Sequence, residues 1–136
     1  MDKDQKRKII SYRDLDVYQR SYKTSVFICT KVIYSLPKEE KYDLVDQLRR
    51  SSKAIPRLIA EGYAKKHQKR GFQKYLADAM AEANETSVGL CQCRDIYSKF
   101  VDVKICQKLI EECDIIGKQL YRLEESWNKF SQKPKD

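Results

Sequence analysis

The stretch of sequence that decides the fold reads Gln47-Leu48-Arg49-Arg50-Ser51-Ser52-Lys53-Ala54-Ile55-Pro56-Arg57-Leu58-Ile59-Ala60-Glu61-Gly62. On a helix with about 100° per residue, Leu48 and Ile55 fall on one side. The cations Arg50, Lys53 and Arg57 fall roughly on the opposite side. One face of this predicted helix is therefore suited to a hydrophobic core, and the other carries positive charge.

The composition indicates helices along the whole chain. Its 136 residues are enough for one domain with a core that needs no disulfides or metals. Glycine (4) and proline (3) are scarce, and 35% of the residues are charged. The hydrophobic residues recur at helical rather than alternating spacing. We expect an all-α protein.

Four amphipathic segments follow one another along the chain. The first starts after Ser11-Tyr12-Arg13-Asp14, which has the form of a capping box, and ends at Leu36-Pro37. The second starts with the acids of Lys38-Glu39-Glu40, the third at Phe72, and the fourth after Asp102, a predicted N-cap. We expect an antiparallel up-down-up-down four-helix bundle over residues 11–130. Residues 1–10 are predicted to form a flexible charged tail, and residues 131–136 a flexible C-terminal tail.

Two residues interrupt the helical pattern. Pro56 lies inside the second helix, where it removes one backbone hydrogen bond and should kink the helix or split it near Ser52. Gly89 lies inside the third helix at a cost of about 1 kcal/mol relative to alanine. A close contact with a neighbouring helix is our interpretation of that glycine.

The charge balance favours a polyanionic partner such as RNA. The chain has 28 Lys and Arg against 20 Asp and Glu, a formal net charge of +8. Arginine can bind phosphate through two parallel hydrogen bonds, and repeated cations can follow a phosphate backbone. The alternative is an ordinary solvated helix face. The candidate nucleic-acid-binding residues are Arg49, Arg50, Lys53, Arg57, Lys65, Lys66, Lys69, Arg70 and Lys74.

Arg49 has a second interpretation. It lies nearer the apolar edge of its helix than Lys53 does, so it could instead pair with Glu61 or Glu85 on a neighbouring helix or subunit. Phosphate contact and a buried ion pair both stay open for this residue.

No catalytic or metal-binding pattern is expected. His67 has no cysteine or carboxylate at ligand spacing, and the sequence has no glycine-rich phosphate loop or nucleophile elbow. Most of the five cysteines fall on or beside apolar stripes, which predicts buried thiols. Tyr18 and Tyr22 have core spacing, and Tyr63 beside the basic turn is the candidate for base stacking. We expect a non-enzymatic protein without cofactors.

The expected compartment is the cytoplasm. None of the cysteines forms a CxxC motif, which favours free thiols in a reducing environment. Neither a signal peptide nor an apolar run of membrane-spanning length is visible. A membrane partner is therefore not expected.

Several of these segments together resemble a known family. They resemble the small bacterial four-helix-bundle proteins encoded in intervening sequences of large-subunit (23S) ribosomal RNA genes, over about residues 12–127. The segments that carry the resemblance are Tyr12-Arg13-Asp14-Leu15-Asp16-Val17-Tyr18, Leu36-Pro37-Lys38-Glu39-Glu40 with Tyr42 and Leu44, Gln47-Leu48-Arg49-Arg50-Ser51, and Ile55-Pro56 with Ile59-Ala60-Glu61-Gly62.

The chain departs from the family pattern at a few positions. Ala54 stands where the family usually has serine, and Leu58 where it usually has asparagine. Ala81-Glu82 replaces a glycine-serine pair, while Glu85 is retained. These changes weaken the transfer of a shared polar role at the second helix and leave the expected fold unchanged.

The resemblance implies a ring-forming bundle, typically a homopentamer, that binds structured or ribosomal RNA and has no known catalysis. A similar branch, the accessory variability determinant proteins of diversity-generating retroelements, implies an alternative. In that alternative the chain is an accessory subunit that binds a reverse transcriptase and its template RNA during mutagenic cDNA synthesis.

Overall fold

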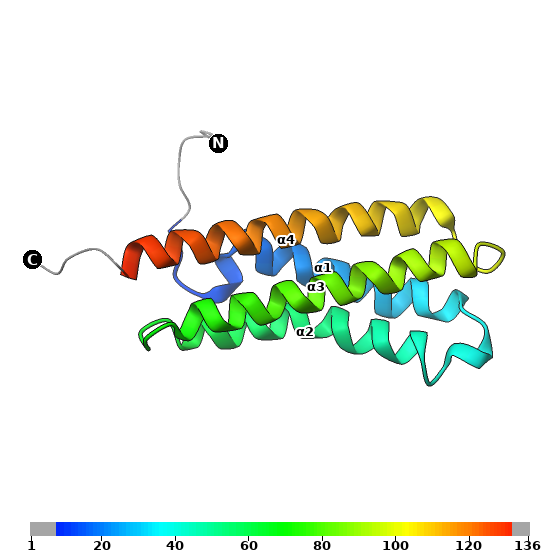
Figure 1. Cartoon of the computed structure of the whole chain (residues 1–136), viewed down its shortest axis with the longest axis horizontal. Helices are drawn as coiled ribbons and strands as arrows, with labels where there is room; N and C mark the ends of the chain where they lie inside the picture. Colours follow the sequence, from blue (N-terminus) through cyan, green and yellow to red (C-terminus); the bar gives the residue numbers. More distant parts are fainter. Residues whose placement is uncertain (1–7, 132–136) are drawn as a thin grey trace, which may run out of the picture.

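The computed structural model describes residues 8–131 and consists of four long helices (Figure 1). The long helices are α1 (Asp16–Phe27), α2 (Leu44–Ala64), α3 (Gly71–Ile96) and α4 (Val103–Ser131). The shorter segments are η1 (Tyr12–Asp14), η2 (Ile28–Val32), η3 (Ile33–Ser35) and η4 (Lys38–Glu40). Within residues 8–131 there is no β-strand. The predicted tails, 1–10 and 131–136, lie almost wholly outside this range.

The helices pack as a bundle in which each runs antiparallel to the next (Figure 1). Helix α2 contacts α1 and α3, and α4 contacts α3 and α1. This order confirms the predicted all-α four-helix bundle. It also places the outer faces of α2 and α4 on opposite sides of the molecule.

The predicted caps are confirmed at two helix starts. The Ser11 side chain accepts from the backbone N–H of Arg13 at 3.0 Å, and the Asp14 carboxylate accepts from the N–H of Ser11 at 2.9 Å. Asp102 Oδ1 accepts from the backbone N–H groups of Lys104 and Ile105 at 3.0 and 3.2 Å. Both sites satisfy helix N–H groups that have no partner inside the helix.

The first helix is less regular than its sequence pattern predicts. After Phe27 the chain continues as the π-helical segment η2 and then the 3₁₀ turn η3, before Leu36 turns extended ahead of Pro37. The predicted end at Leu36-Pro37 is thus confirmed. Buried Ser21, Thr24 and Ser25 bond back to backbone carbonyls, a habit that competes with regular helix geometry.

The second helix starts later than predicted. Lys38–Glu40 forms the separate turn η4, and α2 begins at Leu44. The Glu40 carboxylate explains the offset, because it accepts from the Leu44 N–H at 3.0 Å and also from the Tyr97 hydroxyl. That second hydrogen bond raises the pKa of Tyr97 to about 12. One acid thus caps α2 and ties it to the end of α3.

Pro56 does not divide the second helix. Helix α2 is continuous from Leu44 to Ala64, so the alternative of two helices separated near Ser52 is wrong. Pro56 itself is buried on the side of α2 that faces α1. The kink stays a prediction.

The core consists of two apolar clusters separated by a polar layer. One cluster surrounds Ile28, Leu48 and Leu90, and the other surrounds Phe72 and Ile116. Between them Thr86 of α3 donates to Ser51 of α2 at 2.9 Å, with both side chains buried. Small hydrogen-bonded side chains therefore hold the middle of the bundle, in keeping with the rule that buried polar groups find partners.

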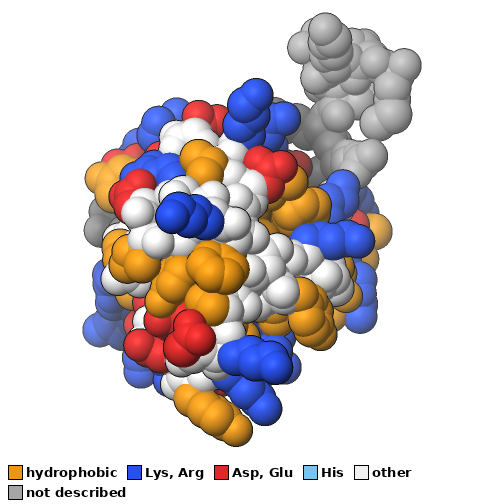
Figure 2. All heavy atoms as spheres, turned by 90° about the vertical axis from the view of Figure 1, so that its right-hand side faces the viewer, with side chains coloured by type: hydrophobic (Ala, Val, Ile, Leu, Met, Phe, Trp, Pro, Cys, Tyr) orange, Lys and Arg blue, Asp and Glu red, His pale blue; other side chains and the backbone are white. Residues whose placement is uncertain are grey.

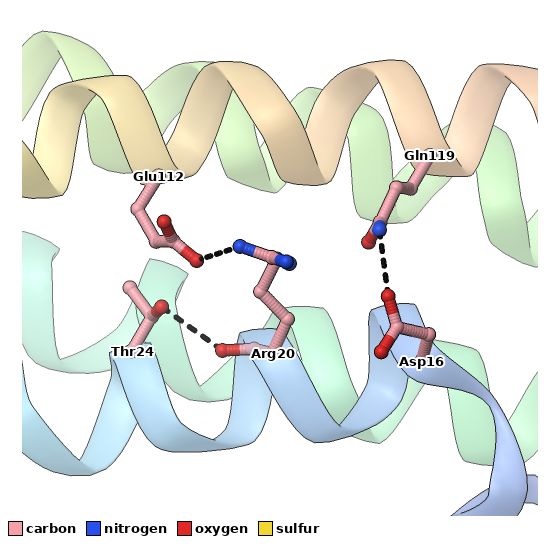
Figure 3. A network of polar contacts seen from close by, with 5 residues as sticks. All are labelled: Asp16, Arg20, Thr24, Glu112 and Gln119. Atoms are coloured by element: carbon pink, nitrogen blue, oxygen red, sulfur yellow. Dashed lines mark hydrogen bonds and ion pairs between the residues drawn. The ribbon is translucent and has the colours of Figure 1, made fainter. Parts of the chain in front are cut away.

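Helices α1 and α4 are joined by a polar network (Figure 3). The Arg20 guanidinium pairs with Glu112 at 2.5 Å, and Gln119 donates to Asp16 at 2.8 Å. Arg20 also accepts from the Thr24 hydroxyl through its backbone carbonyl at 2.9 Å. The Arg20–Glu112 and Gln119–Asp16 contacts tie the two helices together across a half-exposed seam, and the Thr24 contact lies within α1.

Two helix glycines should respond oppositely to alanine. A Cβ at Gly89 would lie 2.7 Å from Leu48 Cδ2, whereas nothing lies within 4 Å of one at Gly117. This confirms the close contact predicted at Gly89. We expect Gly117→Ala to stabilise the fold by about 0.5–1 kcal/mol through helix propensity. Gly89→Ala should destabilise it by about 1–3 kcal/mol through overpacking. Urea denaturation measures both, and equal effects would contradict the packing argument.

One end of the bundle exposes hydrophobic groups. Figure 2 faces the end with the α1–α2 and α3–α4 connections and shows hydrophobic side chains interspersed with acidic and basic ones. The large exposed residues at or near this end include Tyr34, Tyr42, Ile96 and Phe100. Within residues 8–131, none of the helices has the length and apolar character to cross a membrane.

Candidate nucleic-acid interface

The predicted cations of α2 lie on its outer face. Leu48 and Ile55 are buried in the core, while Arg49 and Arg57 are exposed and Lys53 is half-buried. The amphipathic pattern thus predicted correctly which side of α2 meets solvent. The cations are held on a rigid helix rather than on a loop.

Arg50, rather than Arg49, forms the ion pair on this face. The Arg50 guanidinium lies 3.6 Å from the Glu85 carboxylate, with 69% and 43% of the two side chains exposed. Arg49 is exposed, so the predicted buried pair with Glu61 or Glu85 is wrong within this chain. Adjacent side chains on a helix point about 100° apart, so Arg50 points toward α3 and Glu85 while Arg49 points toward the α1 side.

The edge of α2 beside α3 is partly neutralised by acids. Glu82 lies next to Glu85 on α3, and burial together with the Glu85 carboxylate raises the pKa of Glu82. Arg50 opposes part of that shift. Arg50 thus pairs with an acid of α3, whereas Arg49, Lys53 and Arg57 of α2 form no ion pair within residues 8–131. Ala54 and Leu58, which follow Arg50 by one and two helical turns, are half-buried.

The basic turn between α2 and α3 provides the second group of cations. The Lys65 ammonium donates to the Tyr75 hydroxyl at 2.6 Å, which raises the pKa of Lys65. The Lys66 ammonium lies 3.9 Å from the centre of the Tyr63 ring. The side chains of Lys69, Arg70 and Lys74 are exposed, and together with Lys65 they line a surface hollow of about 510 Å³.

The conformation of this turn depends on Gly71. A Cβ there would lie 2.1 Å from the Lys65 carbonyl oxygen, so only glycine allows the chain to close before α3. Arg70, just before it, has φ 55°. The basic residues of the turn are therefore carried by a tight backbone. Arg57 and Lys65 are eight residues apart, about 12 Å along the helix axis, so the turn cations follow those of α2 toward the α2–α3 end of the bundle.

The site also includes a groove that the sequence did not reveal. It runs between α1 and α2 and has a volume of about 450 Å³. The residues that line it are Tyr12, Tyr18, Tyr22, Ser25, Val26, Cys29, Thr30, Lys53, Pro56, Arg57 and Ala60.

The aromatic residues of the site are distributed differently from the prediction. Tyr22 is 53% exposed, so its assignment to the core was wrong. Tyr63, the predicted stacking residue, is half-buried and packs edge-on against Phe72 at 5.9 Å between ring centres. Spacing alone misplaced Tyr22 because the α1 core positions beside it are occupied by Ser21 and Ser25. The small size of Ser21 and Ser25 was the signal in the sequence that these positions, and not Tyr22, face the neighbouring helices.

The histidine lies apart from the cysteines in the structure. His67 is exposed, and within residues 8–131 no three His, Cys, Asp or Glu side chains cluster as metal ligands. Cys93, Cys106 and Cys113 are buried as predicted, and burial raises the pKa of Cys93 and of Cys113 to about 12. Cys29 and Cys91 are half-buried.

Comparisons with known proteins agree with this architecture. The family model described as 23S rRNA-intervening sequence protein matches residues 13–122. A crystal structure of a protein of unknown function from the S23 ribosomal protein family of Bacteroides thetaiotaomicron is also similar. It has a TM-score of 0.65 and 25% identity, covering 80% of this chain and 95% of that one. Among proteins with curated descriptions, none matches.

Proposed function

The chain belongs to the family of 23S rRNA-intervening sequence proteins, and from this premise we propose that it binds RNA through the basic side of α2 and the following turn. One observation carries the proposal. Among the candidate cations only Arg50 forms an ion pair within residues 8–131, and Lys65 and Lys66 contact tyrosines. The cations left available to phosphate are Arg49, Lys53, Arg57, Lys69, Arg70 and Lys74.

The proposed contact is to the phosphate backbone. Arg57 and Lys53 on α2 and Lys69, Arg70 and Lys74 beyond it offer side chains on a helix and a tight turn. Contacts of this kind fix position and carry little sequence information. We therefore propose RNA binding with weak sequence preference and no catalysis.

Self-association is part of the same proposal. The resemblance implies a ring, typically a pentamer, and a ring would repeat the basic face around its circumference. Exposed Tyr34, Tyr42 and Ile96 at one end of the bundle support an interface, because large exposed apolar groups often mark contact surfaces. A reverse transcriptase partner stays a prediction from the resemblance alone.

Salt titration tests the proposed phosphate contacts. We expect the logarithm of RNA affinity to fall with the logarithm of salt concentration with a slope of roughly −2 or steeper, at about −0.7 per phosphate for a single strand. Fluorescence anisotropy of labelled RNA measures the affinity, and circular dichroism at each salt concentration confirms that the helices remain folded. A flat response would contradict phosphate contacts.

A further inference from the structure

The groove between α1 and α2 has a continuous aromatic wall. The ring centres of Tyr12 and Tyr18 are 4.9 Å apart with their planes at 77°, and those of Tyr18 and Tyr22 are 5.9 Å apart with planes at 30°. Burial and the two neighbouring tyrosines raise the pKa of Tyr18, so this ring stays neutral at physiological pH. Tyr18 and Tyr22 of α1 form most of this wall, and Tyr12 of η1 extends it with the Arg13 guanidinium 4.7 Å from the centre of its ring.

The opposite wall of the groove carries positive charge. Lys53 and Arg57 of α2 line it together with Pro56, and they belong to the basic face that the proposed function uses. Neither cation forms an ion pair within residues 8–131. Aromatic rings and unpaired cations therefore meet across one hollow, whose volume of about 450 Å³ lies within the range of 300–1,000 Å³ typical of ligand pockets.

We propose that this groove accommodates an unpaired base of single-stranded RNA against Tyr18 and Tyr22, with the adjoining phosphate on Lys53 and Arg57. Proteins that bind single strands combine aromatic rings that stack on bases with cations that follow the backbone. A base inside a duplex is already stacked and paired, so it cannot enter such a groove. The inference rests on the proposed function and narrows its substrate to unpaired segments.

Tyr22 is the residue to substitute, because it is exposed and its replacement leaves the core intact. We expect Tyr22→Leu to weaken binding of a single-stranded RNA about tenfold, since the leucine side chain cannot stack on the base. Binding of an RNA duplex of equal length should not change. Tyr22→Phe keeps the ring and should bind as the wild type does. Tyr121→Leu, which alters a similarly exposed tyrosine on α4, is the matched control.

Cys29 allows the groove to be tested in the protein of wild-type sequence. Its thiol is half-buried in the groove, 3.7 Å from the Ser52 hydroxyl, while Cys91 is half-buried on α3 away from the groove. We expect single-stranded RNA to slow alkylation of Cys29 several-fold and to leave that of Cys91 unchanged, as measured by mass spectrometry. Equal rates at Cys29 with and without RNA would overturn the groove assignment.

The outcomes separate this inference from the proposed function. A wild-type protein that binds neither single-stranded nor duplex RNA contradicts both. If it binds the two RNAs equally and Tyr22→Leu has no effect, the groove assignment is wrong and RNA binding stands. If Tyr22→Leu instead changes the sedimentation coefficient of the protein while RNA affinity is unchanged, the groove is an interface between copies of the chain and the inference is overturned.

Discussion

Replacing Arg49, Lys53 and Arg57 together with glutamate is expected to lower RNA affinity at least a hundredfold. The three cations lie on the outer face of α2 and are free of ion pairs within residues 8–131. Hydrogen bonds to charged groups contribute about 1.5–3 kcal/mol each, and about 1.4 kcal/mol corresponds to tenfold. Reversal adds repulsion to that loss. Anisotropy of labelled RNA at constant salt measures the change.

The control for this variant changes net charge without touching α2. Lys104, Lys108 and Lys118 are exposed on α4, on the other side of the bundle, and their replacement with glutamate alters the formal charge equally. We expect at most a few-fold loss for that variant, because screening at about 0.1 M salt limits exposed charges to about 10 Å. Equal losses in both variants would show that net charge alone, and not the α2 face, governs binding.

The ion pair of Arg50 determines which substitutions belong in the experiment. The amphipathic pattern alone placed Arg50 in the phosphate-binding stripe, but its guanidinium lies beside Glu85 of α3. Reversing Arg50 would juxtapose three carboxylates, those of Glu82, Glu85 and the new glutamate. A loss of affinity in that variant would therefore mix phosphate contact with altered packing between α2 and α3.

Local sequence signals predicted the fold well wherever one residue's chemistry decides the outcome. Ser11 and Asp102 mark helix starts because their side-chain oxygens satisfy free backbone N–H groups. Pro37 marks a stop, and Gly89 marks a close contact with Leu48. Each signal is local or concerns a single helix pair, so it can be interpreted without knowing the rest of the bundle.

The features that the sequence missed depend on contacts between distant segments. Glu40 delays the start of α2 because it also accepts from Tyr97 at the far end of α3. Arg49 and Arg50 are adjacent in sequence, and only the positions of α1 and α3 beside α2 show that Arg50 is the one that pairs with an acid. Neither of these could be inferred from periodicity within one helix.

The largest expected loss of stability comes from Phe72→Ala. Phe72 has no exposed surface and packs edge-on against Trp127 at 5.1 Å and against Tyr63 at 5.9 Å between ring centres. Truncating a buried phenylalanine removes its transfer free energy and leaves a cavity, which together cost about 3–5 kcal/mol. Because Phe72 directly follows Gly71, the cavity would form beneath the basic turn. We expect a lower free energy of unfolding and, secondarily, weaker RNA binding.

The single tryptophan makes this prediction straightforward to measure. Trp127 is the only tryptophan in the chain and contacts Phe72, so its fluorescence follows urea unfolding and reports the native environment of the ring. Tyr121→Leu, at a 57% exposed position on α4, should cost less than about 0.5 kcal/mol. All variants must be compared at one protein concentration, because self-association adds concentration-dependent stability. A decrease of less than about 1 kcal/mol in the free energy of unfolding for Phe72→Ala would mean that the aromatic cluster does not hold this end of the bundle together. The proposal that this cluster supports the basic turn would then be wrong.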